Sequence, residues 1–238
     1  MQPVVRLRSA VCLLGRFPAL AGIDLDVAAG EVVLLSGGNG AGKTTLLRMI
    51  AGLARLHEGE ATVLGCDLAR DRTSHRKNLA FVGHDTFCYD DLTARENVRF
   101  AARAAGAGVE AADTALECVG LKGSSDVTHG RLSAGQRRRL ALAVAVAREP
   151  QLLLLDEPHA GLDGEGRDVL DAVITAVAAK NRTVLLASHE LDRTRALASR
   201  EVVLRGGQAN GTFDAEPLRK RRSARRPKKD SIVKRDAP

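Results

Sequence analysis

Long apolar segments are missing from this chain of 238 residues. The longest fully apolar run, at 140–147, is far shorter than the roughly 18 residues that a helix needs to cross a bilayer. Arginines interrupt the apolar residues of positions 1–22, which is not the pattern of a signal peptide. The sequence therefore predicts a soluble, cytoplasmic chain with no membrane span of its own.

Cysteine is also scarce. The chain has four cysteines, Cys12, Cys66, Cys88 and Cys118, and no two of them form a C-x-x-C pair. This spacing argues against a disulfide framework and against a cysteine-based zinc site. We expect buried thiols in a reducing compartment.

Most of the chain has no excess of charge of either sign, although the net charge of the whole chain is +7. Residues 219–238 contain ten Lys or Arg and two Asp or Glu, so this segment alone carries a net charge of +8. The other 218 residues contain 26 basic and 27 acidic side chains and are almost neutral. Because the end of the chain has almost no apolar content, we expect residues 212–238 to form a basic, disordered tail.

Short apolar runs alternate with helical patterns along the rest of the chain. Residues 23–27 alternate apolar and polar side chains, as a half-buried strand does, and residues 31–35 form a continuous run typical of a buried strand. Strands that alternate with helices predict an α/β fold with a mainly parallel sheet. Further strands are predicted at 61–65, 78–83, 151–156, 182–188 and 201–206.

The pattern changes between Val82 and Pro150. Two amphipathic helical patterns, at 92–106 and 109–121, follow each other there without a clear strand. We therefore predict one domain at 1–211, with a core of 1–84 and 150–211 and an inserted helical subdomain of 85–149.

A glycine-rich segment provides the first candidate site. The residues GGNGAGKT at 37–44, called the phosphate loop below, match G-x-x-x-x-G-K-[ST] between a predicted strand and a helical run. Successive N–H groups of such a loop point toward phosphate oxygens, and the helix dipole adds positive potential. Lys43 would neutralise the β and γ phosphates, and the Thr44 hydroxyl would bind Mg²⁺.

Two acidic residues end the apolar run that precedes Pro158. Asp156 would place a carboxylate beside a Mg²⁺-bound water, and Glu157 would polarise the attacking water. By itself an acidic strand end is as often a simple turn. Together with the phosphate loop, the pair predicts a nucleoside triphosphatase.

The segment LSAGQ at 132–136 has two interpretations. Ser133 followed by Gln136 matches a helix capping box, and apolar residues continue after it at helical spacing. The same helix start would present the Ser133 hydroxyl and the Gly135 N–H to an anion. The local sequence does not choose between a structural cap and half of a binding site.

Four motifs together resemble those of the ATP-binding cassette ATPases. LSAGQ resembles the signature motif of that family, and LLLLDEP at 152–158 follows it after a short helix. AGLD at 160–163 is similar to the D-loop, and ASHELD at 187–192 carries the expected switch histidine, His189. The resemblance covers residues 5–211 and implies a P-loop NTPase (RecA-like) core with a mainly parallel sheet, an N-terminal antiparallel β part and an inserted α-helical subdomain.

The resemblance also implies roles for particular residues. ATP and Mg²⁺ would be the ligands, Glu157 the general base and His189 the residue that holds the γ-phosphate. Two cassettes would pack head to tail, so that Ser133 of one chain contacts the phosphate bound at Lys43 of the other. Asp163 would link the two sites across that interface.

The complete predicted set falls into three groups. The predicted catalytic residues are Glu157, His189 and Lys43. The predicted metal ligands are Thr44, Asp156 and His84. The predicted nucleotide-binding residues are Gly37, Gly38, Asn39, Gly40, Ala41, Gly42, Lys43, Thr44, Thr45, Ser133, Gly135, Gln136 and Asp163.

Three positions depart from the family pattern. Gly38 stands where the family usually has proline, which should loosen the loop slightly without removing a donor. The usual Mg²⁺-sensing glutamine is absent, and alignment on LTAREN places His84 there, or Asp85 if the register moves by one. At the position of the adenine-stacking aromatic residue the chain has Leu14, with Phe17 as a possible substitute.

The resemblance implies partners as well. A cassette of this length without a membrane span implies a second nucleotide-binding subunit, in a homodimer, and separate integral membrane subunits on whose cytoplasmic side it binds. FVGHDT, LSAGQRRRLALA and LDEPHAGLDGEGRDVL resemble most the ATP-binding subunits of haem exporters in cytochrome c biogenesis. An alternative is a soluble ATPase that acts on nucleic acid through the basic tail. The single cassette and the absence of a long heptad insertion argue against nucleic acid as a partner.

Overall fold

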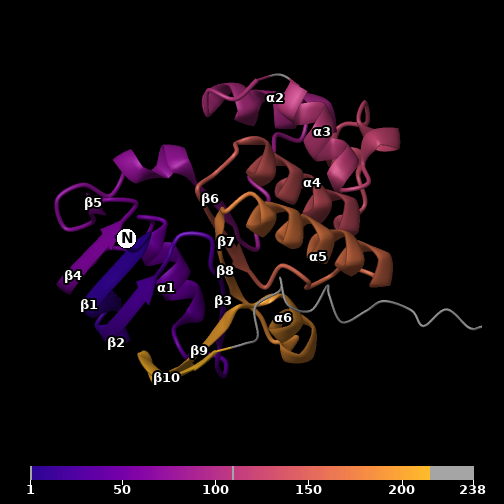
Figure 1. Ribbon diagram of the computed structural model, residues 1–238. Helices are drawn as coiled ribbons and strands as arrows, with labels where there is room; N and C mark the ends of the chain where they lie inside the picture. The colour runs from indigo at the N-terminus through magenta and orange to yellow at the C-terminus, as the bar shows by residue number, and fades with distance from the viewer. Residues whose placement is uncertain (1, 109, 215–238) are drawn as a thin grey trace, which may run out of the picture.

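The described residues of this computed structural model, 2–108 and 110–214, form two β-sheets with helices around them (Figure 1). The smaller sheet comes from the N-terminal part of the chain and is antiparallel, with strand order β2-β1-β4-β5. Its strands are β1 (Val5–Leu14), β2 (Phe17–Val27), β4 (Glu58–Val63) and β5 (Cys66–Asp67).

The larger sheet has the strand order β10-β9-β3-β8-β7-β6. Strands β9, β3, β8, β7 and β6 pair in parallel, whereas β10 pairs with β9 in the antiparallel direction. This confirms the prediction of a mainly parallel sheet. The strands are β3 (Val32–Ser36), β6 (Leu79–Val82), β7 (Leu152–Asp156), β8 (Thr183–Ala187), β9 (Arg200–Arg205) and β10 (Gln208–Asp214).

Both faces of the larger sheet are buried, which explains why its strands are continuous apolar runs. On one face, residues such as Leu35 and Leu154 pack against α1 (Lys43–Ile50) and the smaller sheet. On the other face, residues such as Leu34 and Leu153 pack against α4 (Ala134–Ala147) and α5 (Gly164–Ala179). Because successive strand residues point to opposite faces, one apolar run supplies both cores.

Helices fill the insertion between β6 and β7. The helices α2 (Ala94–Ala104), α3 (Glu110–Cys118) and α4 pack against one another, at the top of Figure 1. The helix α6 (Leu191–Leu197) follows β8. Short 3₁₀ turns lie at Ser74–Asn78, Lys122–Ser124 and His129–Arg131. Within the described ranges, no helix combines the length and the apolar character needed to cross a bilayer.

Three strands, β1, the two-residue β5 and β10, lie where the sequence pattern indicates none. In β1 the alternation is interrupted at Ser9, where φ is +46° and the pairing with β2 shifts register. Strand β10 follows a Gly206–Gly207 turn and continues to Asp214, so the ordered domain extends beyond residue 211, where we expected it to end. The rest of the expected tail, 215–238, lies outside the described residues.

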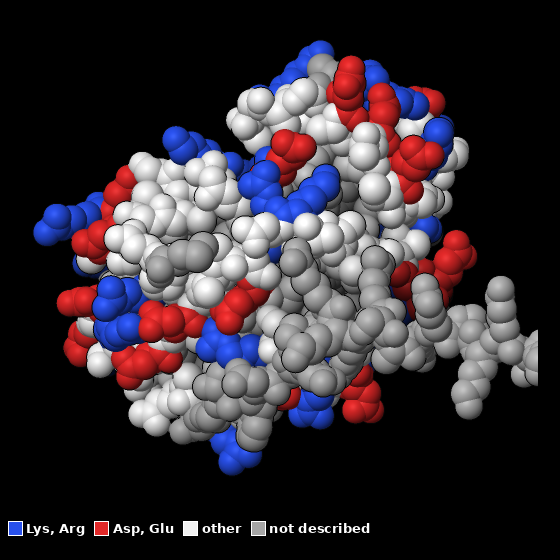
Figure 2. Space-filling model, viewed as in Figure 1, with Lys and Arg blue, Asp and Glu red and all other residues white. Residues whose placement is uncertain are grey.

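The surface of the described domain agrees with its almost neutral composition. Figure 2 shows Lys, Arg, Asp and Glu side chains interspersed over the face in view. Many are paired: the Arg95 guanidinium lies 3.1 Å from the Asp126 carboxylate, for example.

Among the cysteines, only Cys12 is fully buried and Cys118 is exposed, so our expectation of four buried thiols is wrong.

Candidate active site

The phosphate loop connects the end of β3 to the start of α1, as predicted. Gly42 precedes the helix with φ of +103°, and no side chain caps the first turn. The N–H groups of that turn therefore remain available to an anion. Gly37 has φ of +141°, and a Cβ atom there would lie 2.3 Å from the Leu204 carbonyl oxygen. Glycine at 37 is therefore required by close backbone packing as well as by its conformation.

Lys43 lies across the phosphate loop. Its Nζ atom donates hydrogen bonds to the carbonyl oxygens of Gly37, at 2.8 Å, and Gly38, at 3.2 Å. The side chain is 7% exposed, so its ammonium group is already held at the loop. Of the other predicted loop residues, Gly38, Asn39 and Gly40 are exposed, and Ala41 and Thr45 are buried. A Cβ atom at Gly38 would meet nothing within 4 Å, so nothing in its surroundings requires glycine there.

The structure brings together two of the three predicted metal ligands. The Thr44 hydroxyl, at the start of α1, donates a hydrogen bond of 3.1 Å to Asp156 Oδ1 at the end of β7. Hydroxyl and carboxylate oxygens are the kinds of ligand that Mg²⁺ prefers, so this pair fits the ion. The His84 side chain is exposed, and within the described ranges it makes no hydrogen bond or ion pair with either residue. Asp85 lies instead on the wall of a neighbouring groove.

Glu157 and His189 form the second pair. Glu157 Oε1 lies 3.2 Å from His189 Nε2, and the His189 backbone N–H donates to Glu157 Oε2 at 3.1 Å. Despite this proximity, Oε1 is buried and accepts no hydrogen bond of good geometry from the described residues. Glu157 also has a φ of +47°, an uncommon conformation for a residue with a side chain. The carboxylate is thus oriented and keeps one oxygen for a further donor, such as water.

The start of α4 confirms the capping box. Ser133 Oγ accepts a hydrogen bond from the Gln136 N–H at 3.2 Å, and Gln136 Oε1 accepts one from the Ser133 N–H at 2.9 Å. Ser133 is exposed, and a Cβ atom at Gly135 would meet nothing within 4 Å. The side chain of Gln136 also donates to Ser124 Oγ, at 3.3 Å. The cap therefore leaves the Ser133 O–H donor free to bind a ligand outside the chain.

Asp163 has a similar structural role at the start of α5. Its Oδ1 atom accepts a hydrogen bond of 2.7 Å from the Gly166 N–H. The preceding His159 is buried, and its Nε2 atom lies 2.9 Å from Asp171 Oδ1. Asp171 in turn accepts a 2.6 Å hydrogen bond from Arg193 of α6. This chain of contacts connects His159, the residue directly before the D-loop, to the helix that follows His189, and sequence reasoning missed it.

Arg138 is a second residue that sequence reasoning missed. Its guanidinium reaches from α4 to the ends of two strands, where it donates to the carbonyl oxygens of Gly83, Asp156 and Glu157. Burial lowers the pKa of this guanidinium, against the opposing effect of the two nearby carboxylates. The sequence offers no signal for it, because Arg137 and Arg139 flank it.

The comparisons with known proteins agree with this geometry. A family model described as "ABC transporter" matches residues 20–160. The chain belongs to this family. A cytochrome c biogenesis ATP-binding export protein, CcmA, of Bordetella bronchiseptica is 42% identical over 185 residues, which cover 77% of this chain and 83% of that protein. A CcmA protein of Salmonella paratyphi A is 41% identical over 189 residues, or 79% and 91% of the two chains.

A solved structure shares the fold. The dimeric structure of MJ0796, a bacterial ABC transporter cassette, superposes with a TM-score of 0.83 and 24% identity and covers 90% of this chain and all of that chain. The prediction of a P-loop NTPase fold is thereby confirmed. The chain is the ATP-binding and ATP-hydrolysing subunit of an ABC transporter, as the family and the site indicate. No finding on residues 2–108 and 110–214 favours the nucleic-acid alternative.

Proposed function

We propose that this chain drives a membrane exporter that serves cytochrome c biogenesis, with haem as the exported molecule. The observation that carries this proposal is the identity of 42% to CcmA of Bordetella bronchiseptica over most of both chains. The motifs FVGHDT and LSAGQRRRLALA support the same subgroup. In this proposal the chain lies on the inner face of the cell membrane, bound to separate membrane subunits.

The proposed hydrolytic mechanism uses the residues at the strand ends. The N–H groups of the phosphate loop and the Lys43 ammonium bind the β and γ phosphates. Glu157 accepts the proton of a water that attacks the γ-phosphorus atom. The bond from that phosphorus to the β,γ-bridging oxygen breaks, so that ADP leaves and inorganic phosphate forms. His189, 3.2 Å from the Glu157 carboxylate, orients that carboxylate and holds the γ-phosphate.

Mg²⁺ fits the same site. Thr44 and Asp156 would hold it together with the phosphates, and the ion would neutralise charge that develops on the phosphate oxygens. The described residues contain no cluster of three or more His, Cys, Asp or Glu side chains that could bind a metal without a nucleotide. A site completed by substrate phosphates is the usual arrangement for this ion.

The exposed signature motif supports a homodimer. Ser133 and Gly135 would donate to the γ-phosphate held at Lys43 of a second copy, and Asp163 would lie at the same interface. ATP would then stabilise the closed dimer, and hydrolysis would remove that link. Energy would thus be coupled to opening and closing of the pair.

Adenine recognition would involve Phe17, which is 80% exposed at the β1–β2 turn. The start of β2, which carries Phe17, lies beside the phosphate loop, because a Cβ atom at Gly42 would be 2.7 Å from the Ala19 carbonyl oxygen. We expect Phe17→Ala to raise the KM for ATP about fivefold, the loss of roughly 1 kcal/mol of stacking. Steady-state ATPase assays test this, with Leu14→Ala as the control. A larger rise for Leu14→Ala would assign the stacking to Leu14.

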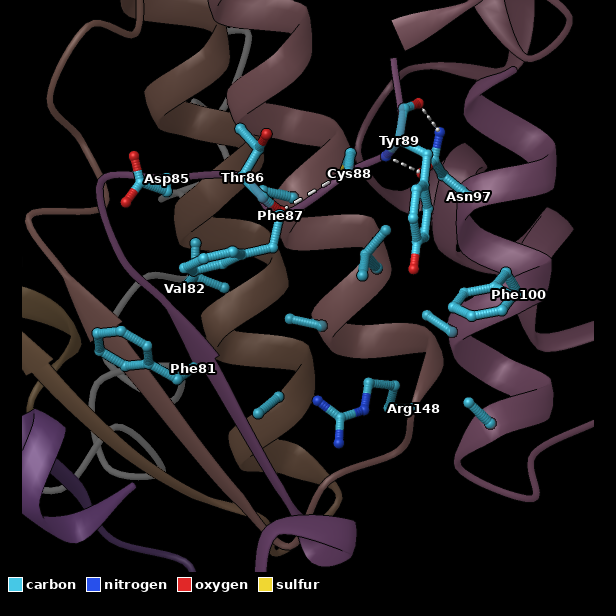
Figure 3. Close-up of a pocket in the computed structure, with 16 residues that line it drawn as sticks. Phe81, Val82, Asp85, Thr86, Phe87, Cys88, Tyr89, Asn97, Phe100 and Arg148 are labelled. Atoms are coloured by element: carbon cyan, nitrogen blue, oxygen red, sulfur yellow. Dashed lines mark hydrogen bonds between the residues drawn. The ribbon is translucent and has the colours of Figure 1, made fainter. Parts of the chain in front are cut away.

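A groove beside the site is the proposed docking surface for the membrane subunit. It measures about 310 Å³ and lies between β6, the loop 83–92 and the helices α2 and α4. In Figure 3 the rings of Tyr89 and Phe100 lie on one side of the groove and those of Phe81 and Phe87 on the other. The rings of Tyr89 and Phe100 meet edge to face, with centroids 5.5 Å apart.

The groove suits an apolar helix of the membrane subunit. Phe87 is 76% exposed and Phe100 54% exposed, and exposed apolar side chains gathered around a groove mark an interaction site. Asn97 fixes the rim, since it accepts from the Tyr89 N–H at 2.8 Å and donates to the Tyr89 carbonyl at 3.1 Å. The loop that forms this rim begins at Gly83, next to the catalytic strands.

A charged side chain introduced into the groove is expected to weaken binding of the chain to the membrane subunit. Phe100→Asp should lower the amount that co-purifies with the membrane subunits about tenfold, as the loss of a buried aromatic anchor does. Leu53→Asp is the matched control, because Leu53 is also 54% exposed but does not line the groove. Equal retention of the two variants would contradict this docking surface.

The export proposal is tested in cells that lack the chain. We expect such cells to lose covalent haem from their c-type cytochromes, and to recover it with the wild-type chain but not with Glu157→Gln. Haem staining of membrane proteins is the measurement. Normal haem attachment in the deletion strain would contradict this cargo, while leaving the ATPase assignment unaffected.

A further inference from the structure

We infer that Arg138 is a positioning residue, which ties the orientation of the signature helix to the catalytic base of the same chain. The inference rests on the proposed dimer, because the signature motif must contact a nucleotide for the tie to matter. It adds a connection between the two nucleotide sites that neither site shows alone.

The contacts of Arg138 all lie at one edge of the parallel sheet. Strands β6 and β7 are neighbours, and Val82 at the end of β6 pairs with Leu155, the residue before Asp156. Beyond that edge the guanidinium donates to the carbonyl oxygen of Gly83, to that of Asp156 at 3.0 Å, and to that of Glu157 at 2.8 Å. One planar fork thereby joins the loop after β6 to the loop after β7.

Among the described residues, the Arg138 guanidinium donates hydrogen bonds only to these three carbonyl oxygens. It makes no ion pair with the carboxylates of the described residues, although Asp156 and Glu157 are close enough to favour its charge. A half-buried cation that donates only to main-chain oxygens fixes peptide orientation rather than side-chain charge. The peptide groups fixed here belong to the two residues whose side chains face Thr44 and His189.

The hydrogen bonds from Arg138 help to hold an uncommon backbone conformation at Glu157. Glu157 has a φ of +47°, and such a conformation persists only where the surroundings determine it. Glu157 makes four other contacts within the described residues. Its N–H donates to the Ala187 carbonyl at 2.9 Å, its carbonyl accepts from the Ala160 N–H at 3.2 Å, and its carboxylate contacts the His189 N–H and ring. Arg138 is the contact that comes from outside the sheet and its loops.

Arg138 lies on α4, the helix that begins at the signature motif, so its contacts can transmit a movement of that helix. Arg138 lies five residues after Ser133, so about 7.5 Å separates the two along a rigid helix. A shift of α4 when Ser133 engages the partner's nucleotide would move the guanidinium, and with it the peptide that carries Glu157. Hydrolysis in each site would then depend on nucleotide in the other.

The test compares two neighbouring arginines. Arg138→Gln should lower kcat for ATP about 30-fold, because a small displacement of a catalytic group has an effect of this order. The KM should change by less than about twofold, and the Hill coefficient for ATP should fall toward one. Arg139→Gln is the matched control, since Arg139 lies on the same helix and donates to a carbonyl, that of Val119, away from the site. We expect it to keep wild-type kcat and cooperativity.

A conservative variant covers loss of folding. Arg138→Lys keeps the charge but not the planar fork, and we expect a kcat between those of wild type and Arg138→Gln, with an unchanged melting temperature. Wild-type kcat and cooperativity in folded Arg138→Lys would overturn the inference, as would equal effects of Arg138→Gln and Arg139→Gln. Failure of the proposed dimer gives a different result: Glu157→Gln with intact Arg138 would then stay monomeric in ATP.

Discussion

Glu157→Gln is expected to lower the rate of ATP hydrolysis by at least about 100-fold, the usual effect of removing a general base. Glutamine has the same shape and can still accept the hydrogen bond that Glu157 Oε2 receives from the His189 N–H. It cannot take a proton from water at Oε1, the oxygen that lacks a hydrogen-bond donor among the described residues. Phosphate release by the purified chain is the measurement.

The same variant should accumulate in the closed state. Because ATP binds and is not consumed, the variant is expected to elute as a dimer in ATP and as a monomer in ADP. Glu165→Gln is a suitable control, since Glu165 lies in the first turn of α5 and outside the site. A Glu157→Gln protein that retains more than about a tenth of the wild-type rate would exclude Glu157 as the base.

Ser133→Arg is expected to abolish hydrolysis while the single chain still binds ATP. The substitution places a long side chain where the partner's phosphate would approach, but it leaves Lys43 and the phosphate loop of its own chain intact. We expect a loss in kcat of about 100-fold or more, since no closed dimer forms. Binding of a fluorescent ATP analogue and phosphate release, measured on the same sample, separate the two effects.

A second capping box provides the control for this variant. Thr93 caps α2 as Ser133 caps α4: its side chain accepts from the Glu96 N–H, and Glu96 accepts from the Thr93 N–H. Thr93→Arg therefore has the same cost in helix capping, about 1 kcal/mol, without a place at the proposed interface. Equal losses of activity in the two variants would mean that LSAGQ is only a helix start.

The sheet core could be predicted from sequence because its physical signal is local. A parallel strand buried on both faces is a continuous apolar run, and residues 152–156 show this directly. The smaller sheet gives a weaker signal, since the shift at Ser9 breaks the alternation of β1. Strand β10 depends on its pairing with β9 rather than on its own composition, so its extension to Asp214 could not be read from the chain.

The candidate site was predictable where the backbone imposes a residue type. Gly37 and Gly42 have conformations and close contacts that favour glycine, and the Thr44–Asp156 contact follows from a loop and a strand end that meet. Side chains whose contacts are with residues distant in the sequence leave no such pattern in the sequence. Arg138 differs from its neighbours only in what it reaches, and that depends on the packing of α4 against the sheet edge.

The most direct test of the proposed head-to-tail pair joins the signature motif of one chain to the phosphate loop of another. Two variants of Glu157→Gln are needed, one with Asn39→Cys and one with Ser133→Cys, each with serine at positions 66, 88 and 118. In ATP, a short bifunctional maleimide should cross-link the mixture into a dimer that contains one chain of each kind. Cross-linked dimers of the Ser133→Cys chain alone, or none in the mixture, would contradict the shared nucleotide site.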